Sequence, residues 1–194
     1  MAKLPIDVQN ALKRQAPKLL RRDFEKETRK QFKKLKNEMI KDFLTDSVTL
    51  ELLEGAGAAN ISGTLGGISN LFAFIGFDSG EQPISPILQL LEGTQITYKR
   101  QIKQKDIGIE FEVSLPTAQD IFAITPLPWA SGRSWSEGIE RGLSGLGYLL
   151  RKNKGRSGAA IQSRVNKVRG GKFQNRPYIS ALIKKYKKRF EDLK

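Results

Sequence analysis

The chain of 194 residues contains no cysteine and no histidine. The lack of cysteine excludes disulfide bonds, thiolate chemistry and cysteine-ligated zinc. The lack of histidine removes the side chain most used for acid–base catalysis near neutral pH. No apolar run approaches the roughly 18 residues that span a bilayer, and the N-terminal MAKLPIDVQ lacks the apolar core of a signal peptide. We therefore expect neither a membrane protein nor most kinds of enzyme, but a protein made and used in a cytoplasm, or assembled there into a particle.

Patterns that could carry chemistry are incomplete. The glycine-rich segment 60–77 has no Lys-Ser or Lys-Thr after its glycines and no GxGxxG motif, which argues against a nucleotide site. Glu137 and Glu140 lie one helical turn apart, but no nucleophile or third acid adjoins them, so acids favoured by a helix N-terminus explain them better. The central acids lack the spacing of a calcium or magnesium loop: Asp78, Glu81, Asp106, Glu110 and Glu112. We predict no catalytic residue, no cofactor and no metal.

Charge is distributed unevenly along the chain, whose formal net charge is +14. Residues 1–46 carry 13 basic and 7 acidic side chains, residues 47–150 carry 6 and 11, and residues 151–194 carry 15 and 2. Two basic ends therefore flank a neutral to acidic body. This distribution indicates an anionic partner, such as nucleic acid, a membrane surface or an acidic protein. A solvated basic surface without a partner is the alternative.

The N-terminal region has the strongest helical pattern. Residues 6–16 predict a short helix, and Pro17 fits the first turn of a longer helix over 17–45, where a proline loses no hydrogen bond. The apolar residues of that helix recur at helical spacings, interrupted by Thr28: Leu20, Phe24, Phe32, Leu35, Met39 and Phe43. Its length is about 43 Å at about 1.5 Å per residue. We expect it to lie partly against a sheet and partly against a neighbouring subunit, a coiled-coil seam being the alternative.

The next region predicts strands and a short helix. Residues 48–53 (VTLELL) are predicted as a strand, and so is the apolar run at 71–77, with a flexible glycine-bearing loop between them. Residues 84–91 begin near two prolines and stop at Gly93, which predicts a short helix or a cluster of turns.

The clearest strand pattern follows. Apolar and polar residues alternate over 96–102 and again over 107–115, which predicts an antiparallel hairpin with one buried face. The sequence TAQD at 117–120 matches a helix N-cap followed three residues later by an acid. We expect a short helix to start there and to end at Pro126.

The segment 126–145 contains both tryptophans and begins another helical pattern. From Ser136 the apolar spacing predicts a helix that reaches about residue 150: Ile139, Leu143, Leu146 and Leu150. Three glycines can lie along one face of this helix: Gly138, Gly142 and Gly145. They would allow another element to approach closely, with irregular packing equally compatible.

Residues 151–176 are rich in Gly, Ser, Lys, Arg and Asn and have almost no core-forming residues, which predicts an extended arm or long loop. Its basic residues are spaced without aromatics until Phe173, a pattern suited to phosphates but not to reading bases: Arg151, Lys152, Lys154, Arg156, Arg164, Lys167, Arg169, Lys172 and Arg176. An arm that orders only on assembly with neighbouring copies is the alternative. Pro177 then opens a last amphipathic helix.

Together these patterns predict an α+β fold. An antiparallel sheet, built as a hairpin or β-meander, would pack against the long N-terminal helix and the C-terminal helix. We expect one domain with extensions: an N-terminal helical segment at 1–46, an α+β core at 47–150, a basic arm or loop at 151–176 and a C-terminal helix at 177–194.

Tryptophan dominates both cores and interfaces, so the two tryptophans are predicted either as buried anchors or as subunit contacts. Stacking on nucleic-acid bases is a further interpretation of the same side chains. The predicted subunit interface comprises six residues: Trp129, Trp135, Glu137, Glu140, Arg141 and Tyr178.

The order of these features resembles that of the neck or tail-completion proteins, the head–tail connectors of long-tailed bacteriophages. The residues that match the first motif are Trp135, Glu137, Gly138, Glu140, Arg141 and Gly142, and those that match the second are Pro177, Tyr178, Ile179 and Ala181. The stretches NISGTLGG at 60–67 and PWASGRSW at 128–135 are also similar to virion proteins of large marine and cyanobacterial phages.

The resemblance implies a ring of identical subunits, commonly six, between the portal side of the capsid and the tail tube. Double-stranded DNA leaves through the channel of that ring. The sequence departs from the family pattern in its longer first helix, in Trp135-Ser136 where an aromatic-Ala is usual, and in the extra material at 55–93. These departures leave open which layer of the neck it would form.

We therefore expect a structural virion protein in a homo-oligomeric ring, a hexamer by resemblance. Its partners would be neighbouring neck, portal-side or tail proteins and channel DNA bound without sequence preference, and no membrane. The basic arm would reach a neighbouring ring or line the channel. The alternative is a monomeric, sequence-independent nucleic-acid-binding module of the ribosome- or nucleoid-associated kind, and an enzyme is not expected.

The arm yields a direct test. Deletion of residues 152–172 is expected to leave a chain that still melts cooperatively, because the arm has few core-forming residues, but that no longer assembles or binds DNA. Thermal melting followed by circular dichroism, beside light scattering and DNA titration, measures these properties. Loss of folding would refute the interpretation as an arm.

Overall fold

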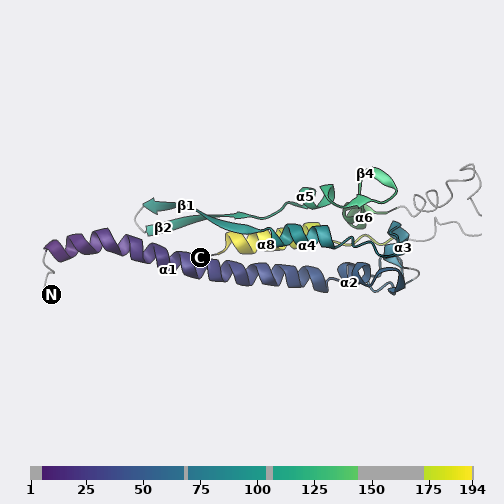
Figure 1. Ribbon diagram of the computed structural model, residues 1–194, viewed down its shortest axis with the longest axis horizontal. Coiled ribbons are helices and arrows are strands. Elements are labelled where there is room, and N and C mark those ends of the chain that lie inside the picture. Colours follow the sequence, from purple (N-terminus) through teal and green to yellow (C-terminus); the bar gives the residue numbers. More distant parts are fainter. Residues whose placement is uncertain (1–5, 68–69, 104–106, 144–172, 194) are drawn as a thin grey trace, which may run out of the picture.

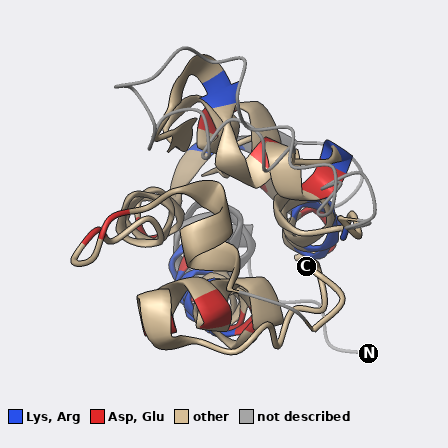
Figure 2. Ribbon diagram, turned by 90° about the vertical axis from the view of Figure 1, so that its right-hand side faces the viewer, with Lys and Arg blue, Asp and Glu red and all other residues tan. Residues whose placement is uncertain are grey.

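The computed structural model describes residues 6–67, 70–103, 107–143 and 173–193. The molecule is elongated, with helix α1 (Ile6–Thr45) running beside a β-hairpin and the C-terminal helix α8 (Ile179–Glu191) (Figure 1). Figure 2 views it along its length, from the end at which helix α2 (Ser47–Glu54) follows α1. The predicted α+β class is confirmed, although each sheet among the described residues has only two strands.

Helix α1 is one helix of 40 residues, not the two helices predicted on either side of Pro17. A proline removes one backbone donor and strains the turn before it, yet the helix continues through Pro17. At about 1.5 Å per residue α1 is about 60 Å long, even longer than expected.

Within residues 21–45 of α1, the apolar stripe meets the core from Thr28 onward. Phe32, Met39 and Phe43 are buried, and Thr28 is buried with them. Phe24 is 50% exposed. The ring centroids of Phe32 and Phe190 lie 5.4 Å apart, so the last turn of α8 packs against α1 at Phe32.

Both apolar runs predicted as strands are helices. Helix α2 begins after Asp46, whose carboxylate accepts a hydrogen bond from Val48 N at 2.8 Å. Helix α3 (Leu71–Ile75) begins after Asn70, whose side chain accepts one from Ala73 N at 2.9 Å. Periodicity alone does not separate a short buried strand from a short buried helix, and the N-caps favour the helix here. Helix α4 (Ser85–Glu92) confirms the short helix predicted at 84–91.

The glycine-bearing loop between α2 and α3 is organised by a buried carboxylate. Glu51 is 0% exposed and accepts hydrogen bonds from Asn60 Nδ2 at 2.9 Å, Ser62 N at 3.1 Å and Leu71 N at 2.7 Å. A buried carboxylate without partners is very unfavourable, so this loop folds around the donors that Glu51 requires.

Strands β1 (Gln95–Lys103) and β2 (Ile107–Ser114) form the predicted antiparallel hairpin. Tyr98 pairs with Phe111 across the strands, with ring centroids 6.2 Å apart. On the exposed side, Lys99 forms an ion pair with Glu112 at 2.6 Å. The apolar side of β2 is only half-buried, although its sequence predicts full burial.

The chain then forms the predicted capped helix and a second small hairpin. Helix α5 (Ala118–Ala123) begins with a capping box between Thr117 and Asp120, which confirms the prediction. Strands β3 (Pro126–Leu127) and β4 (Ala130–Ser134) follow, and helix α6 (Trp135–Arg141) starts at once.

Helix α6 ends at Arg141 and does not continue as predicted toward residue 150. Gly142 has φ +116°, a conformation that side-chain-bearing residues rarely adopt, and it turns the chain out of the helix. Leu143 then folds back over Gly138, where a Cβ atom would lie 2.5 Å from Leu143 Cδ2. The close contact at Gly138 is thus made by a side chain that directly follows the same helix and not by another element, while Gly145, Leu146 and Leu150 lie outside the described residues.

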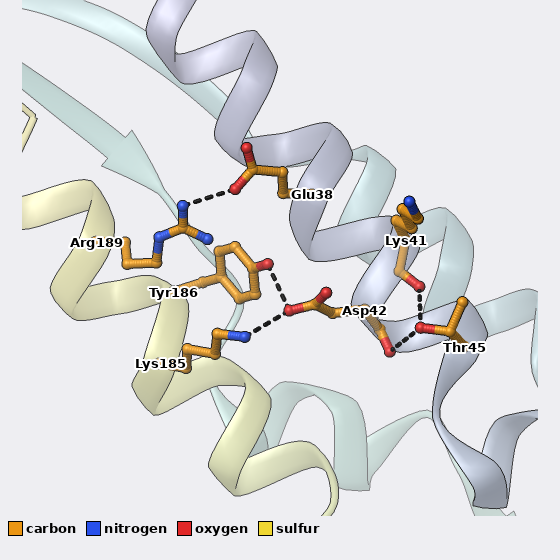
Figure 3. Close-up of polar contacts among 7 residues, drawn as sticks. All are labelled: Glu38, Lys41, Asp42, Thr45, Lys185, Tyr186 and Arg189. Carbon is orange, nitrogen blue, oxygen red and sulfur yellow. Dashed lines mark hydrogen bonds and ion pairs between the residues drawn. The ribbon is translucent and has the colours of Figure 1, made fainter.

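Polar contacts flank the apolar packing between α1 and α8 (Figure 3). Asp42 accepts hydrogen bonds from Lys185 Nζ at 2.6 Å and from the Tyr186 hydroxyl at 2.7 Å, and Arg189 forms an ion pair with Glu38 at 2.6 Å. The hydrogen bond from Lys185, followed by that from Tyr186, holds the pKa of Asp42 below its ordinary value of 3.8. Burial raises the pKa of Tyr186, so its hydroxyl remains a donor at neutral pH.

Asp42→Asn tests this contact through its pH dependence. Because the folded pKa lies below the unfolded one, the carboxylate stabilises the fold above about pH 4, and the contribution is lost as pH falls through the folded pKa. Since the side chain is partly exposed, we expect a loss of no more than about 1 kcal/mol at pH 7. Urea unfolding should show the difference from wild type shrinking below about pH 3.

The matched control is Asp23→Asn, which removes an exposed carboxylate from the same helix. This change should leave the free energy of unfolding within about 0.5 kcal/mol of wild type. A difference between the Asp42 variant and wild type that is constant from pH 7 to pH 2.5 would contradict the assigned role of the carboxylate.

Candidate assembly interface

The two segments that carry the resemblance meet in one contact, here called the α6–α8 joint. It comprises residues 134–142, at the end of β4 and along α6, and residues 173–181, which lead into α8. Arg176 N donates to Ile139 O at 3.2 Å, and the Asn175 side chain lies 3.5 Å from where a Cβ atom on Gly142 would stand. Segments about 40 residues apart in the sequence thus form one structural unit.

Trp135 lies at the centre of this joint. Its backbone N donates to Thr125 O at 2.8 Å, and the Thr125 hydroxyl shares hydrogen bonds of 2.7 Å with both Ser134 and Ser136. The indole is 2% exposed, with its ring centroid 6.5 Å from that of Tyr178. The small hydroxyl side chains beside Trp135 let the corner close, which explains serine at position 136.

Tyr178 connects the joint to the far end of α1. Its hydroxyl shares a hydrogen bond of 2.7 Å with Thr49 of α2, and its ring lies 6.2 Å from that of Phe43. Burial raises the pKa of this tyrosine, so it stays neutral. Trp135 and Tyr178 were predicted as subunit contacts, but both side chains are buried within the chain, which for Trp135 matches the alternative of a buried anchor.

Glu140 caps helix α8 from outside that helix. Its two carboxylate oxygens accept hydrogen bonds from Ser180 N and from the Ser180 hydroxyl, each at 2.6 Å. Tyr178 is at the N-cap position, but its side chain makes no capping hydrogen bond to the first turn of α8. A carboxylate at a helix N-terminus satisfies a free N–H group and interacts favourably with the helix dipole. Glu140 therefore fixes where α8 starts.

The remaining predicted interface residues lie nearer the surface. Glu137 and Arg141 form an ion pair at 2.8 Å on the outer side of α6. Trp129 is half-buried, and its indole N–H donates to Ile75 O at 2.7 Å. These three residues remain accessible to a neighbour, whereas Glu140 is already engaged by α8.

The predicted basic arm falls almost entirely outside the described residues: Arg151, Lys152, Lys154, Arg156, Arg164, Lys167, Arg169 and Lys172. Arg176 is described, and its guanidinium donates to Ser62 O in the glycine-bearing loop. Gln174 N donates to Thr64 O at 2.8 Å beside it. Sequence reasoning missed this anchoring role, because a backbone carbonyl as partner leaves no signal in the sequence.

A hollow lies beside the joint, and each of its ionisable groups has a partner within the fold. It measures 360 Å³, and its ionisable groups are Asp42, Asp46, Tyr178 and Lys185. Asp42 binds Lys185, Asp46 caps α2 and Tyr178 binds Thr49. Across the part of the chain that the structure describes, no three or more acids gather where they could hold a metal ion, and no helix is both long and apolar enough to cross a bilayer.

Comparison with known proteins gave no match, whether to protein-family models, to curated proteins or to solved structures.

Glu140→Ala tests the joint. Removal of the external cap should lower the free energy of unfolding by about 1 kcal/mol, since it leaves a helix N-terminus unsatisfied. Ser180→Ala should lower it by less, and the double variant should fall short of the sum of the two, because both side chains belong to one contact. Urea denaturation of the four proteins measures this.

Glu137→Ala serves as the control, because it breaks only an exposed ion pair on the same helix. Its effect should be about 0.5 kcal/mol or below. If Glu140→Ala were no more destabilising than Glu137→Ala, the capping role would be wrong.

Proposed function

We propose that the chain is a structural virion protein of a tailed bacteriophage and forms a ring in the neck, around the channel through which DNA leaves the capsid. The observation that carries this proposal is the α6–α8 joint. The residues that resemble the neck family come from two short, separate motifs, and Trp135, Glu140, Tyr178 and Ser180 bring those motifs together. Motifs that form one structural unit carry more weight than two unrelated matches.

The surface chemistry supports a scaffold role. The ionisable groups beside the joint all have partners within the fold, and the buried carboxylate of Glu51 holds a loop. An elongated body with a helix of about 60 Å offers a long side for contact with neighbouring subunits.

A cationic stripe on α1 could face the channel DNA. Four lysines line a shallow depression on this helix together with Asn37 and Glu38: Lys30, Lys33, Lys34 and Lys41. Helix α8 adds five more cations, of which Lys185 and Arg189 pair with acids of α1. Spacings of three, four and seven residues align the lysines of α1 along one helix side, which suits sequence-independent contact with phosphates.

The same stripe favours a second candidate function, a monomeric sequence-independent nucleic-acid-binding module. The two candidates differ in assembly: a neck protein must form a closed ring, whereas a binding module acts as a single chain. The oligomeric state separates them.

Light scattering after size exclusion, with electron microscopy of the eluted peak, is the direct experiment. The neck proposal expects rings, six-fold by resemblance, at high protein concentration or on addition of a neck neighbour. A chain that stays monomeric in both conditions, with tight and salt-sensitive DNA binding, would reject the ring and favour the second function.

Titration with duplex DNA over a range of salt concentrations tests the stripe. The triple substitution K33A/K34A/K41A should lower the slope of log affinity against log salt by about 0.9 for each phosphate that is no longer neutralised, at most about 3 in all. As the control, K26A/K99A changes lysines outside the depression. An unchanged slope in the triple variant would exclude the stripe from DNA contact.

A further inference from the structure

An apolar groove lies between strand β2 and helix α8. It measures 450 Å³; Phe111, Val113 and Leu115 line one side, and Ile183 and Phe190 of α8 line the other. The three residues of β2 and its end are only half-buried. A two-stranded sheet is marginal without further packing on its apolar face, so this groove is suited to an apolar partner.

A protruding apolar surface lies at the end of the molecule that carries α2. Leu50 and Leu53 of α2 are 38% and 54% exposed, and Ile61 in the adjoining loop is 49% exposed. The opposite side of α2 is in the core through Val48 and Leu52. Leu50 lies three residues before Leu53 and four before Glu54, so the three share the outward side of the helix.

The two surfaces carry residues of opposite charge, Glu54 and Lys187. Glu54 is exposed beside Leu53, whereas Glu51 of the same helix is buried. The Arg176 guanidinium binds Ser62 O next to Ile61. Figure 2 looks onto this end of the molecule. Of the charged residues of α8, Lys187 and Glu191 line the groove, whereas Lys185 and Arg189 pair with acids of α1. Opposite charges at the rim of an apolar contact favour its formation and fix its orientation.

We propose that the α2 end of one copy docks into the β2–α8 groove of the next copy, with Leu53 in the groove and Glu54 near Lys187. The protrusion and the groove lie at different places along the molecule, with α2 at one end and β2 extending toward the other (Figure 1). The contact is therefore head-to-tail, and repetition of such a contact closes a ring when the rotation between copies allows it. This inference rests on the proposed ring function and identifies its lateral contact.

The absence of native cysteine makes disulfide trapping selective, because introduced thiols are the only ones in the chain. Leu53→Cys and Lys187→Cys proteins, mixed and oxidised, should form a mixed disulfide dimer at several times the yield of Leu53→Cys mixed with Lys33→Cys. Lys33 is also exposed but lies on α1 in a different depression. The double variant L53C/K187C should form a ladder of linked copies.

Charge reversal tests the same contact without oxidation. Glu54→Lys and Lys187→Glu should each weaken self-association about tenfold, and the two changes together should restore it. Analytical ultracentrifugation measures association, and circular dichroism confirms that each variant is folded. If each change weakened self-association only by destabilising the fold, combining them would weaken it further, so restored self-association in the combined variant would indicate a direct contact between the two residues.

Several results would overturn the contact: disulfide yield no higher than the Lys33 control, preferential Leu53–Leu53 dimers, or a disulfide within one L53C/K187C chain. The two proposals fail separately. Rings without enriched Leu53–Lys187 linkage would reject this surface and keep the neck function. Enriched linkage in open chains that never close would keep the surface and reject the ring.

Discussion

The packing of helix α8 against helix α1 is the contact on which the rest of the fold depends. The buried Tyr186 and Phe190 of α8 lie against the apolar side of α1, and Asp42 and Glu38 hold the two helices in register from the edge. The β1–β2 hairpin is too small to be stable alone, since two strands bury little apolar surface. It folds because these two helices provide a surface against which its apolar side can lie.

The α6–α8 joint follows from the same requirement. Helix α8 must begin at a fixed place to meet α1 correctly. The side chain of its own N-cap residue, Tyr178, makes no capping hydrogen bond. Glu140 provides the missing acceptor from another element, while Trp135 and Tyr178 fill the space behind it. Glu51 performs a comparable task in the glycine-bearing loop. In both places a carboxylate accepts hydrogen bonds from backbone donors of another segment.

The proposed assembly would use surfaces that the core leaves free. Trp135 and Tyr178 were the most prominent aromatic candidates for a subunit interface, and both side chains are buried in the interior of the chain. Among the described residues, a cationic stripe on α1, the apolar outward side of α2 and a half-covered groove beside β2 stay exposed. A head-to-tail contact needs two different surfaces on each copy, and the last two are those proposed for it.

The sequence by itself determined the elements whose periodicity is long or whose signals are local: the C-terminal part of α1, the hairpin at 95–114, the capping box at Thr117 and the presence of the last helix, which begins at Ile179 and not at the predicted Pro177. The runs at 48–53 and 71–77 were assigned wrongly, because short apolar runs fit a buried strand and a buried helix equally well. Only the tertiary structure decided that Glu140 caps α8, that Arg176 binds Ser62 O and that Leu50 and Leu53 stay outside the core. The physical reason is that long-range hydrogen bonds to backbone atoms and the choice of which apolar side is covered depend on the meeting of distant segments, which no local pattern records.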